Sequence, residues 1–208
     1  MIEDKFKNKY RVQSNRLQGY DYGTNGYYFV TICTQNRVHY FGEIINAKMQ
    51  LSEIGKIAEK FWLDIPNHYL FVILDQFVIM PNHIHGILIF NKNNGPSLGK
   101  DAIYRVSSLS SSTSNDNLFT IDDISKNGGI THIHNPMLHA NLGHVIRWFK
   151  GRVSFESRSY LNFAWLGRFH DRIIRDDDGF EAIRKYIFNN PQNWDEDEFN
   201  DKNITSGL

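Results

Sequence analysis

The sequence predicts a two-layer α+β sandwich, in which an antiparallel sheet carries helices packed on one face. Three observations lead to this prediction. Short β-branched and aromatic segments alternate with a segment of helical periodicity, in the order β, β, α, β, β, before residue 91. Two further helical patterns follow after residue 140, and a short extended stretch at 164–175 separates them. Sheets and helices in this order bury their apolar faces against each other, as in ferredoxin-like and RRM-like folds.

The first half of the predicted sheet starts after an irregular N-terminal arm that ends in a turn at residues 23–26. Residues 27–34, YYFVTICT, are β-branched and aromatic and predict a strand. Residues 41–50 predict a second, weaker strand. A helix then begins with Ser52 as its N-cap, carries apolar side chains at helical spacing and ends near Pro66.

The second half of the fold begins with a strand from residue 68 to residue 80 and a further strand over residues 83–90. Helical periodicity returns over residues 141–157. Three aspartates at 176–178 predict the start of a last helix, because acidic side chains stabilise helix N-termini. This C-terminal helix bears a tyrosine and stops before Pro191.

The chain length of 208 residues predicts a single domain over 1–208. Residues 91–140 interrupt its pattern, because they are rich in Ser, Asn and Gly and contain a serine-rich run at 107–112. A segment of this length and composition predicts a flexible insertion.

The composition predicts a soluble protein of the cytoplasm. The sequence has one cysteine, Cys33, which excludes a disulfide framework and a multi-cysteine zinc site. The N-terminal residues lack the apolar segment of a secretory signal, and the longest apolar runs are too short to span a bilayer.

The net charge of zero is the sum of a basic stretch and an acidic stretch in different parts of the sequence. Residues 144–175 carry seven Arg or Lys against two acidic residues, whereas the tail from residue 193 carries five acidic residues against one Lys. The basic stretch predicts contacts with phosphates, and the acidic tail predicts a solvated face. The candidate DNA-binding residues are Arg147, Lys150, Arg152, Arg168, His170 and Arg172. For His170, a structural hydrogen bond between segments is an equal alternative.

Two histidines stand at the start of the strand at 83–90. His83 and His85 are two residues apart, so their side chains leave the same face of a strand and converge. Neutral imidazoles placed this way form half of a site for a divalent metal. The alternative is a pair of hydrogen-bonded, partly buried histidines. A second pair, His132 and His134, lies in the insertion without a strand to hold it, and is interpreted as a coincidence of a surface loop.

A tyrosine and an asparagine share one face of the last helix. Tyr186 and Asn190 are four residues apart and therefore lie one turn from each other. This arrangement can bring a phenol nucleophile and an oxygen ligand to one place. A tyrosine packed at a helix end, with an asparagine near its C-cap, is the common structural alternative.

Taken together, these motifs resemble the HUH single-stranded DNA transposases that use one catalytic tyrosine. Within them the sequence looks like the REP-associated tyrosine transposase branch of the insertion-sequence 200-like enzymes. The resemblance covers residues 16–90 and 141–194, and the insertion between them departs from the family pattern. The matching stretches are residues 16–22, 22–34, Met80-Pro81-Asn82-His83-Ile84-His85-Gly86, residues 168–175, and Tyr186-Ile187 with Asn189-Asn190-Pro191.

The resemblance implies roles for four of these residues. His83 and His85 would ligate Mg²⁺ or Mn²⁺, Asn190 would supply a third, oxygen ligand, and Tyr186 would be the nucleophile. The implied reaction cleaves and rejoins single-stranded DNA beside a hairpin, through a 5′-phosphotyrosine and a free 3′-hydroxyl. Enzymes of this kind act as monomers or as homodimers, so the expected partners are hairpin-bearing single-stranded DNA and a second copy of the chain.

Three other classes of protein compete with this interpretation. A non-catalytic or domesticated nucleic-acid-binding module of RRM-like fold would stack bases on exposed sheet aromatics. A two-histidine phosphoesterase would need two His-x-Thr/Ser motifs, and neither pair of histidines here has the hydroxyl residue. A plasmid relaxase or a rolling-circle replication initiator resembles the chain less in the order of its motifs.

Overall fold

The computed structural model describes residues 19–92 and 141–200, with the exception of residue 161. In these ranges the main sheet has the strand order β4-β5-β1-β6, and each neighbouring pair is antiparallel. With helices α1 and α5 these strands follow a βαββαβ order, so the predicted ferredoxin-like α+β class is confirmed. The elements are β1 (Gly26–Cys33), α1 (Glu53–Leu63), β4 (Val72–Ile79), β5 (His83–Phe90), α5 (Leu142–Glu156) and β6 (His170–Ile174).

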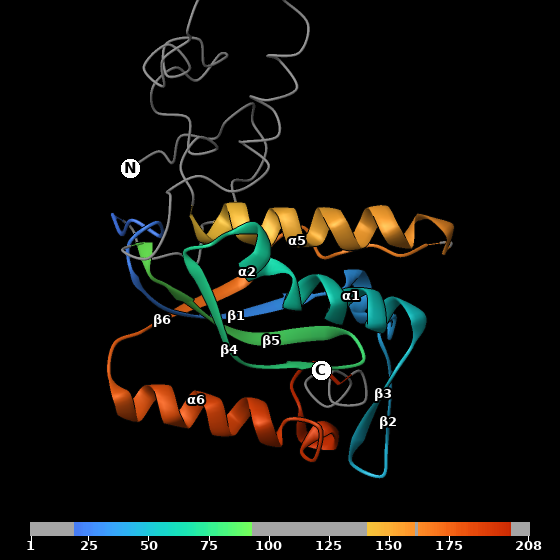
Figure 1. Cartoon of the computed structure of the whole chain (residues 1–208). Helices are drawn as coiled ribbons and strands as arrows, with labels where there is room; N and C mark the ends of the chain where they lie inside the picture. The colour runs from blue at the N-terminus through green and yellow to red at the C-terminus, as the bar shows by residue number, and fades with distance from the viewer. Residues whose placement is uncertain (1–18, 93–140, 161, 201–208) are drawn as a thin grey trace, which may run out of the picture.

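Helices α1 and α5, with the short α2 (Ile65–His68), cover one face of the sheet (Figure 1). Alternate side chains of β1 point into this layer, and Tyr28, Val30 and Ile32 are completely buried there. The hydroxyl of Ser52 accepts a hydrogen bond from the Gly55 N–H, which confirms the predicted N-cap of α1.

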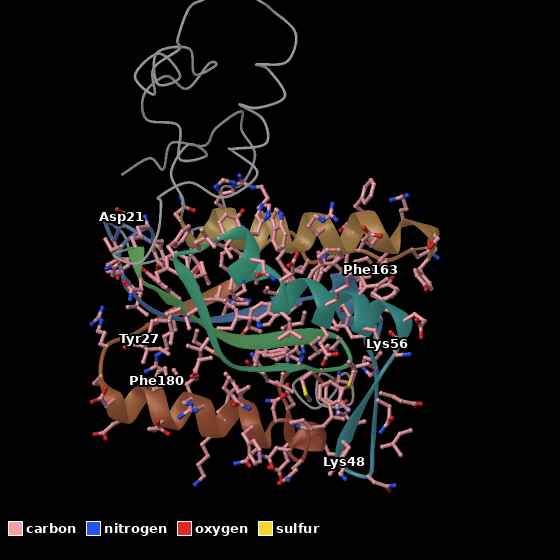
Figure 2. All side chains as sticks on the ribbon, viewed as in Figure 1. Asp21, Tyr27, Lys48, Lys56, Phe163 and Phe180 are labelled. Carbon is pink, nitrogen blue, oxygen red and sulfur yellow. The ribbon has the colours of Figure 1, made fainter. Side chains whose placement is uncertain are left out.

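Helix α6 (Asp177–Asn189) covers the opposite face of the sheet, so the prediction that all helices lie on one face is wrong in this detail (Figure 1). Ile183 and Ile187 of α6 form a second apolar cluster with Ile87 of β5 and Ile174 of β6. Tyr27 of β1 and Phe180 of α6 meet below the sheet with ring centroids 5.2 Å apart (Figure 2). Strand β5 is buried on both faces, which is why the sheet needs a second cover.

The predicted strand at 41–50 forms a separate hairpin of two short strands, β2 (Gly42–Ile45) and β3 (Lys48–Leu51), which projects from the body (Figure 1). Asn46 and Ala47 join them with positive φ angles of 52° and 58°. A two-residue turn with both central residues in this region matches the twist of a tight hairpin. The hairpin is therefore closed by its own turn, and it adds no strand to the main sheet.

Two predictions fall largely or wholly outside the described residues. The predicted insertion lies outside them from residue 93 onward, and so does the second histidine pair, His132 and His134. Where the chain is described, no helix has both the length and the apolar character needed to cross a membrane.

Replacing Gly86 of β5 with alanine should destabilise the fold, because Trp62 of α1 packs directly on this glycine. A methyl group at Gly86 would lie 2.2 Å from Cζ2 of Trp62. Overpacking of this kind costs about 1–3 kcal/mol, which urea denaturation would measure as a fall in the free energy of unfolding. Gly151→Ala in α5 is the matched control, since its added methyl would have no atom within 4 Å apart from its chain neighbours and the backbone of its own helix. Equal stability of the two variants would contradict this account of the packing.

Candidate active site

The two histidines of β5 lie side by side on the face of the sheet that α6 covers. Strand β5 is an inner strand, and His85 is opposite Thr31 of β1 and Val78 of β4. The ring centroids of His83 and His85 are 4.5 Å apart, and both side chains are almost completely buried. The i, i+2 spacing therefore brings the two imidazoles together, as the sequence predicts.

A hydrogen-bond contact at Nδ1 anchors each of the two rings. Nδ1 of His83 lies 2.9 Å from Oδ1 of Asn82, and Nδ1 of His85 lies 2.9 Å from Oγ1 of Thr31. Burial holds the pKa of His83 well below its usual range, and it lowers the pKa of His85 to about 3. Both imidazoles are therefore neutral, which is the form that binds metal ions.

Tyr186 of α6 reaches the histidines from below the sheet. Its hydroxyl lies 3.1 Å from Nε2 of His85, and its ring is packed edge-on against Phe29 of β1. The Tyr186 side chain is still 44% exposed, so one side of it is open to solvent. Burial raises the pKa of Tyr186 to about 12, which keeps the hydroxyl protonated at neutral pH.

Asn190 is the C-cap residue of α6 and lies one turn beyond Tyr186. Its side chain is buried, and its Oδ1 has no hydrogen-bond partner among the described residues. Nε2 of His83 is likewise without a hydrogen-bond partner there. Buried polar atoms without a well-formed hydrogen bond are unusual, because buried polar groups are nearly always paired.

Asp197 completes the group, although no sequence motif points to it. Its Oδ2 lies 3.9 Å from Nε2 of His83, and the ligand atoms of His83, His85 and Asp197 all lie within 4.8 Å of one another. The carboxylate is mostly buried, and burial raises its pKa above the usual range. Two neutral imidazoles and a carboxylate are a donor set that suits a divalent cation.

The interpretation of the acidic tail as a solvated face is wrong for Asp197, although Asp195, Glu196 and Glu198 are exposed. The segment that carries Asp197 packs on the site: Phe199 lies against the His83 ring at 4.6 Å between centroids. The buried positions are Trp194, Asp197 and Asn200, at a spacing of three residues. This spacing, with two aromatic residues among the acids, was the signal that the sequence contained.

The predicted DNA-binding residues fall on different surfaces. Arg147 and Lys150 of α5 line one groove together with Arg168 and His170. Arg172 lines a neighbouring hollow beside α6. Arg152 does not line the groove; its guanidinium lies over the ring of Phe61 in α1, 5.0 Å from the centroid.

The groove runs along α5 and ends at the edge strand β6, whereas Tyr186 lies on the opposite face of the sheet, so β6 separates the two (Figure 1). His170 of the edge strand β6 is opposite Thr31, which in turn is opposite His85. Side chains opposite each other in an antiparallel sheet share a face, and neighbouring strands are about 4.8 Å apart. His170 therefore lies roughly 10 Å from His85 on the face that carries Tyr186.

An uncharacterized protein of Haemophilus influenzae strain Rd is 31% identical to the chain over 188 residues, which cover 89% of this chain and 91% of that protein. The chain belongs to the same family as that protein. No family model matches the sequence.

Two solved structures are similar to the chain. One is the REP-associated tyrosine transposase bound to a REP hairpin, which is 14% identical with a TM-score of 0.48 and covers 88% of this chain and 74% of its own. The other, from Deinococcus radiodurans R1, is provisionally described as a transposase and is 13% identical with a TM-score of 0.35, covering 85% of this chain and 97% of its own.

Proposed function

We propose that the chain is a metal-dependent enzyme that cleaves and rejoins single-stranded DNA through a covalent tyrosine intermediate. The contact that supports this most directly is the 3.1 Å distance from the Tyr186 hydroxyl to Nε2 of His85, two residues 101 positions apart in the sequence. A structural tyrosine–histidine bond would not require the unpartnered Nε2 of His83 and Oδ1 of Asn190 next to it. A catalytic centre accounts for all of these atoms together.

His83, His85 and an oxygen of Asp197 or Asn190 would hold the Mg²⁺ or Mn²⁺ ion. The fit rests on the two neutral imidazoles, the nearby carboxylate and the unpartnered amide oxygen of Asn190. A bound divalent cation would neutralise charge on the non-bridging phosphate oxygens and polarise the scissile bond.

Tyr186 is the proposed nucleophile. Its oxygen would form a bond to phosphorus while the bond from phosphorus to the 3′ oxygen breaks, which leaves a 5′-phosphotyrosine and a free 3′-hydroxyl. The proton that Tyr186 releases is matched by the proton that the leaving 3′ oxygen takes up. Because the phosphodiester is conserved in the tyrosine link, the 3′-hydroxyl can reverse the step without ATP. Tyr186 and the histidines lie in one chain, so the proposed site needs no second copy.

The basic groove would guide the DNA strand to this site. Arg147, Lys150 and Arg168 provide positive charge along it, and His170 lies on the same sheet face as His85. A single strand can bend over the edge of β6 toward Tyr186, whereas a stiff duplex cannot. We therefore expect a single-stranded substrate beside a hairpin, the form that the sequence motifs imply.

The RRM-like alternative is less well supported. A module of that kind uses exposed aromatic side chains on the open face of its sheet. Here α6 covers that face, Tyr28 is completely buried in the opposite layer, and Phe29 packs against His85 and Tyr186. Of the strand aromatics at 27–29, only Tyr27 is exposed, and Phe180 packs against its ring.

The proposed function is tested by incubating the full chain with single-stranded hairpin oligonucleotides and Mn²⁺. The expected product is a protein–DNA adduct that survives SDS and contains the fragment downstream of the cleavage point, joined to the protein through its new 5′ phosphate; the upstream fragment is released with a free 3′-hydroxyl. Duplex DNA of the same sequence should give little adduct. The proposal fails if no hairpin gives an adduct under conditions where the protein is folded and binds Mn²⁺.

Neutralising the groove should weaken binding of single-stranded DNA. We expect the double variant Arg147→Gln with Arg168→Gln to reduce the slope of log affinity against log salt concentration by about 1 to 1.5, since each phosphate contact contributes about 0.7. Fluorescence anisotropy at several salt concentrations measures this slope. Arg152→Gln, outside the groove, should change it less; an equal change would mean that the strand does not follow the groove.

A further inference from the structure

Asn82 immediately precedes the first histidine, and its side chain joins three segments of the protein. Its Oδ1 is 2.9 Å from Nδ1 of His83, and its Nδ2 donates to the carbonyls of Arg37 and Phe199 at 3.0 and 2.8 Å. The residue is 1% exposed. Both amide hydrogens and the amide oxygen are therefore used within the buried site.

These contacts fix the orientation of the Asn82 amide. Turning it over would place its oxygen against two carbonyl oxygens and its NH₂ group against the His83 ring, so two hydrogen bonds would be lost. The atom facing His83 is therefore the oxygen, which can only accept. It follows that Nδ1 of His83 carries the proton and that the lone pair of the neutral ring is on Nε2.

His85 differs from His83 in this respect. Its Nδ1 faces the hydroxyl of Thr31 and its Nε2 faces the hydroxyl of Tyr186. A hydroxyl can donate or accept, so these contacts allow either tautomer of His85. Of the two histidines, only His83 has its tautomer set by its partner.

The same amide also positions the segment that carries Asp197. Phe199, whose carbonyl accepts from Asn82, packs against the His83 ring, and its N–H donates to Oδ1 of Asp197 at 2.6 Å. The other carboxylate oxygen of Asp197 faces Nε2 of His83. Asn82 thus orients the ring from one side and, through Phe199, fixes the position of the carboxylate on the other.

We propose that Asn82 is a positioning residue of the metal centre: it holds His83 as the Nδ1–H tautomer, with the Nε2 lone pair directed at the ion, and seats the carboxylate of Asp197 opposite it. This role rests on the metal centre of the proposed function. Partners of metal-binding histidines act in this way, and their loss typically weakens metal binding by about 10–100-fold.

The tautomer is tested first, on the wild-type chain without metal. Long-range ¹H–¹⁵N NMR correlations distinguish protonated from unprotonated ring nitrogens, and comparison with His83→Ala identifies the signals of His83. The expected result is a protonated Nδ1 and an unprotonated Nε2. A protonated Nε2 overturns the proposal without any need for an Asn82 variant.

Two substitutions then separate the two functions of the Asn82 amide, which are to accept from Nδ1–H of His83 and to donate to the two carbonyls. Asn82→Asp keeps an acceptor for Nδ1–H and removes the two donors, so His83 should keep its tautomer. Asn82→Leu removes both functions, so the tautomer preference should be lost and Mn²⁺ affinity should fall by about 10–100-fold. Thr31→Val, the matched control at His85, should leave the His83 tautomer unchanged.

The outcomes distinguish this role from the proposed function. Unchanged tautomer and unchanged Mn²⁺ affinity in Asn82→Leu overturn the role of Asn82, even if the wild type forms the DNA adduct. If Asn82→Leu does not fold, Asn82→Asp gives the test instead. Because this variant keeps the acceptor for Nδ1–H, a His83 ring that is no longer protonated on Nδ1 would also overturn the role of Asn82. A wild type that binds Mn²⁺ with the expected tautomer but forms no adduct contradicts only the DNA chemistry.

Discussion

Replacing Tyr186 with phenylalanine should abolish the covalent protein–DNA adduct and strand cleavage together, and leave folding and DNA binding intact. The substitution removes one oxygen and keeps the ring that packs against Phe29 and His85. The lost hydrogen bond to His85 is worth about 1 kcal/mol of stability, which is small compared with the stability of a typical domain. The chemical effect is total because the variant has no oxygen at this position to bond to phosphorus.

The measurement is the yield of SDS-resistant adduct on a hairpin oligonucleotide with Mn²⁺, alongside anisotropy for binding. Tyr160→Phe is the matched control, since Tyr160 has a similar exposure, 40% against 44%, and lies beyond the end of α5. It should form adduct like the wild type. Adduct formation by Tyr186→Phe at the wild-type level would place the nucleophile on another residue.

The sequence was sufficient to predict the parts of the site that short-range geometry controls. The spacing of His83 and His85 on a strand fixes their common face, and the spacing of Tyr186 and Asn190 on a helix does the same. Whether the two pairs meet depends on which face of the sheet receives α6. The apolar run of β5 contained this information, because a strand buried on both faces needs a cover on each.

Asp197 could not be predicted in the same way, since its burial depends on contacts distant in sequence. Its segment is held by the packing of Phe199 against His83 and by the hydrogen bond from Asn82 to the Phe199 carbonyl, 117 positions away. The number of acidic residues in the tail, taken alone, predicts that the whole tail is exposed to solvent. The division of the basic residues has a similar cause, because Arg147 and Arg152 leave α5 toward different neighbours.

Replacing both His83 and His85 with alanine should eliminate stabilisation of the protein by Mn²⁺. An ion that binds only the folded state stabilises it by mass action, by about 2.7 kcal/mol at a concentration of 100 times its Kd. The two histidines supply both nitrogen donors of the group, so the double variant keeps only oxygen donors from Asp197 and Asn190. Differential scanning fluorimetry with and without Mn²⁺ measures the change in Tm.

The comparison is made within each variant, because removing two buried rings also opens cavities and lowers the Tm itself. His132→Ala tests the second histidine pair and should retain the full Mn²⁺ shift. Asp197→Ala should reduce the shift more than Asn190→Ala does, since a carboxylate attracts a cation more strongly than a neutral amide. If the shift persists in the double variant, or disappears in His132→Ala, the ion binds elsewhere, and the buried pair on β5 is structural.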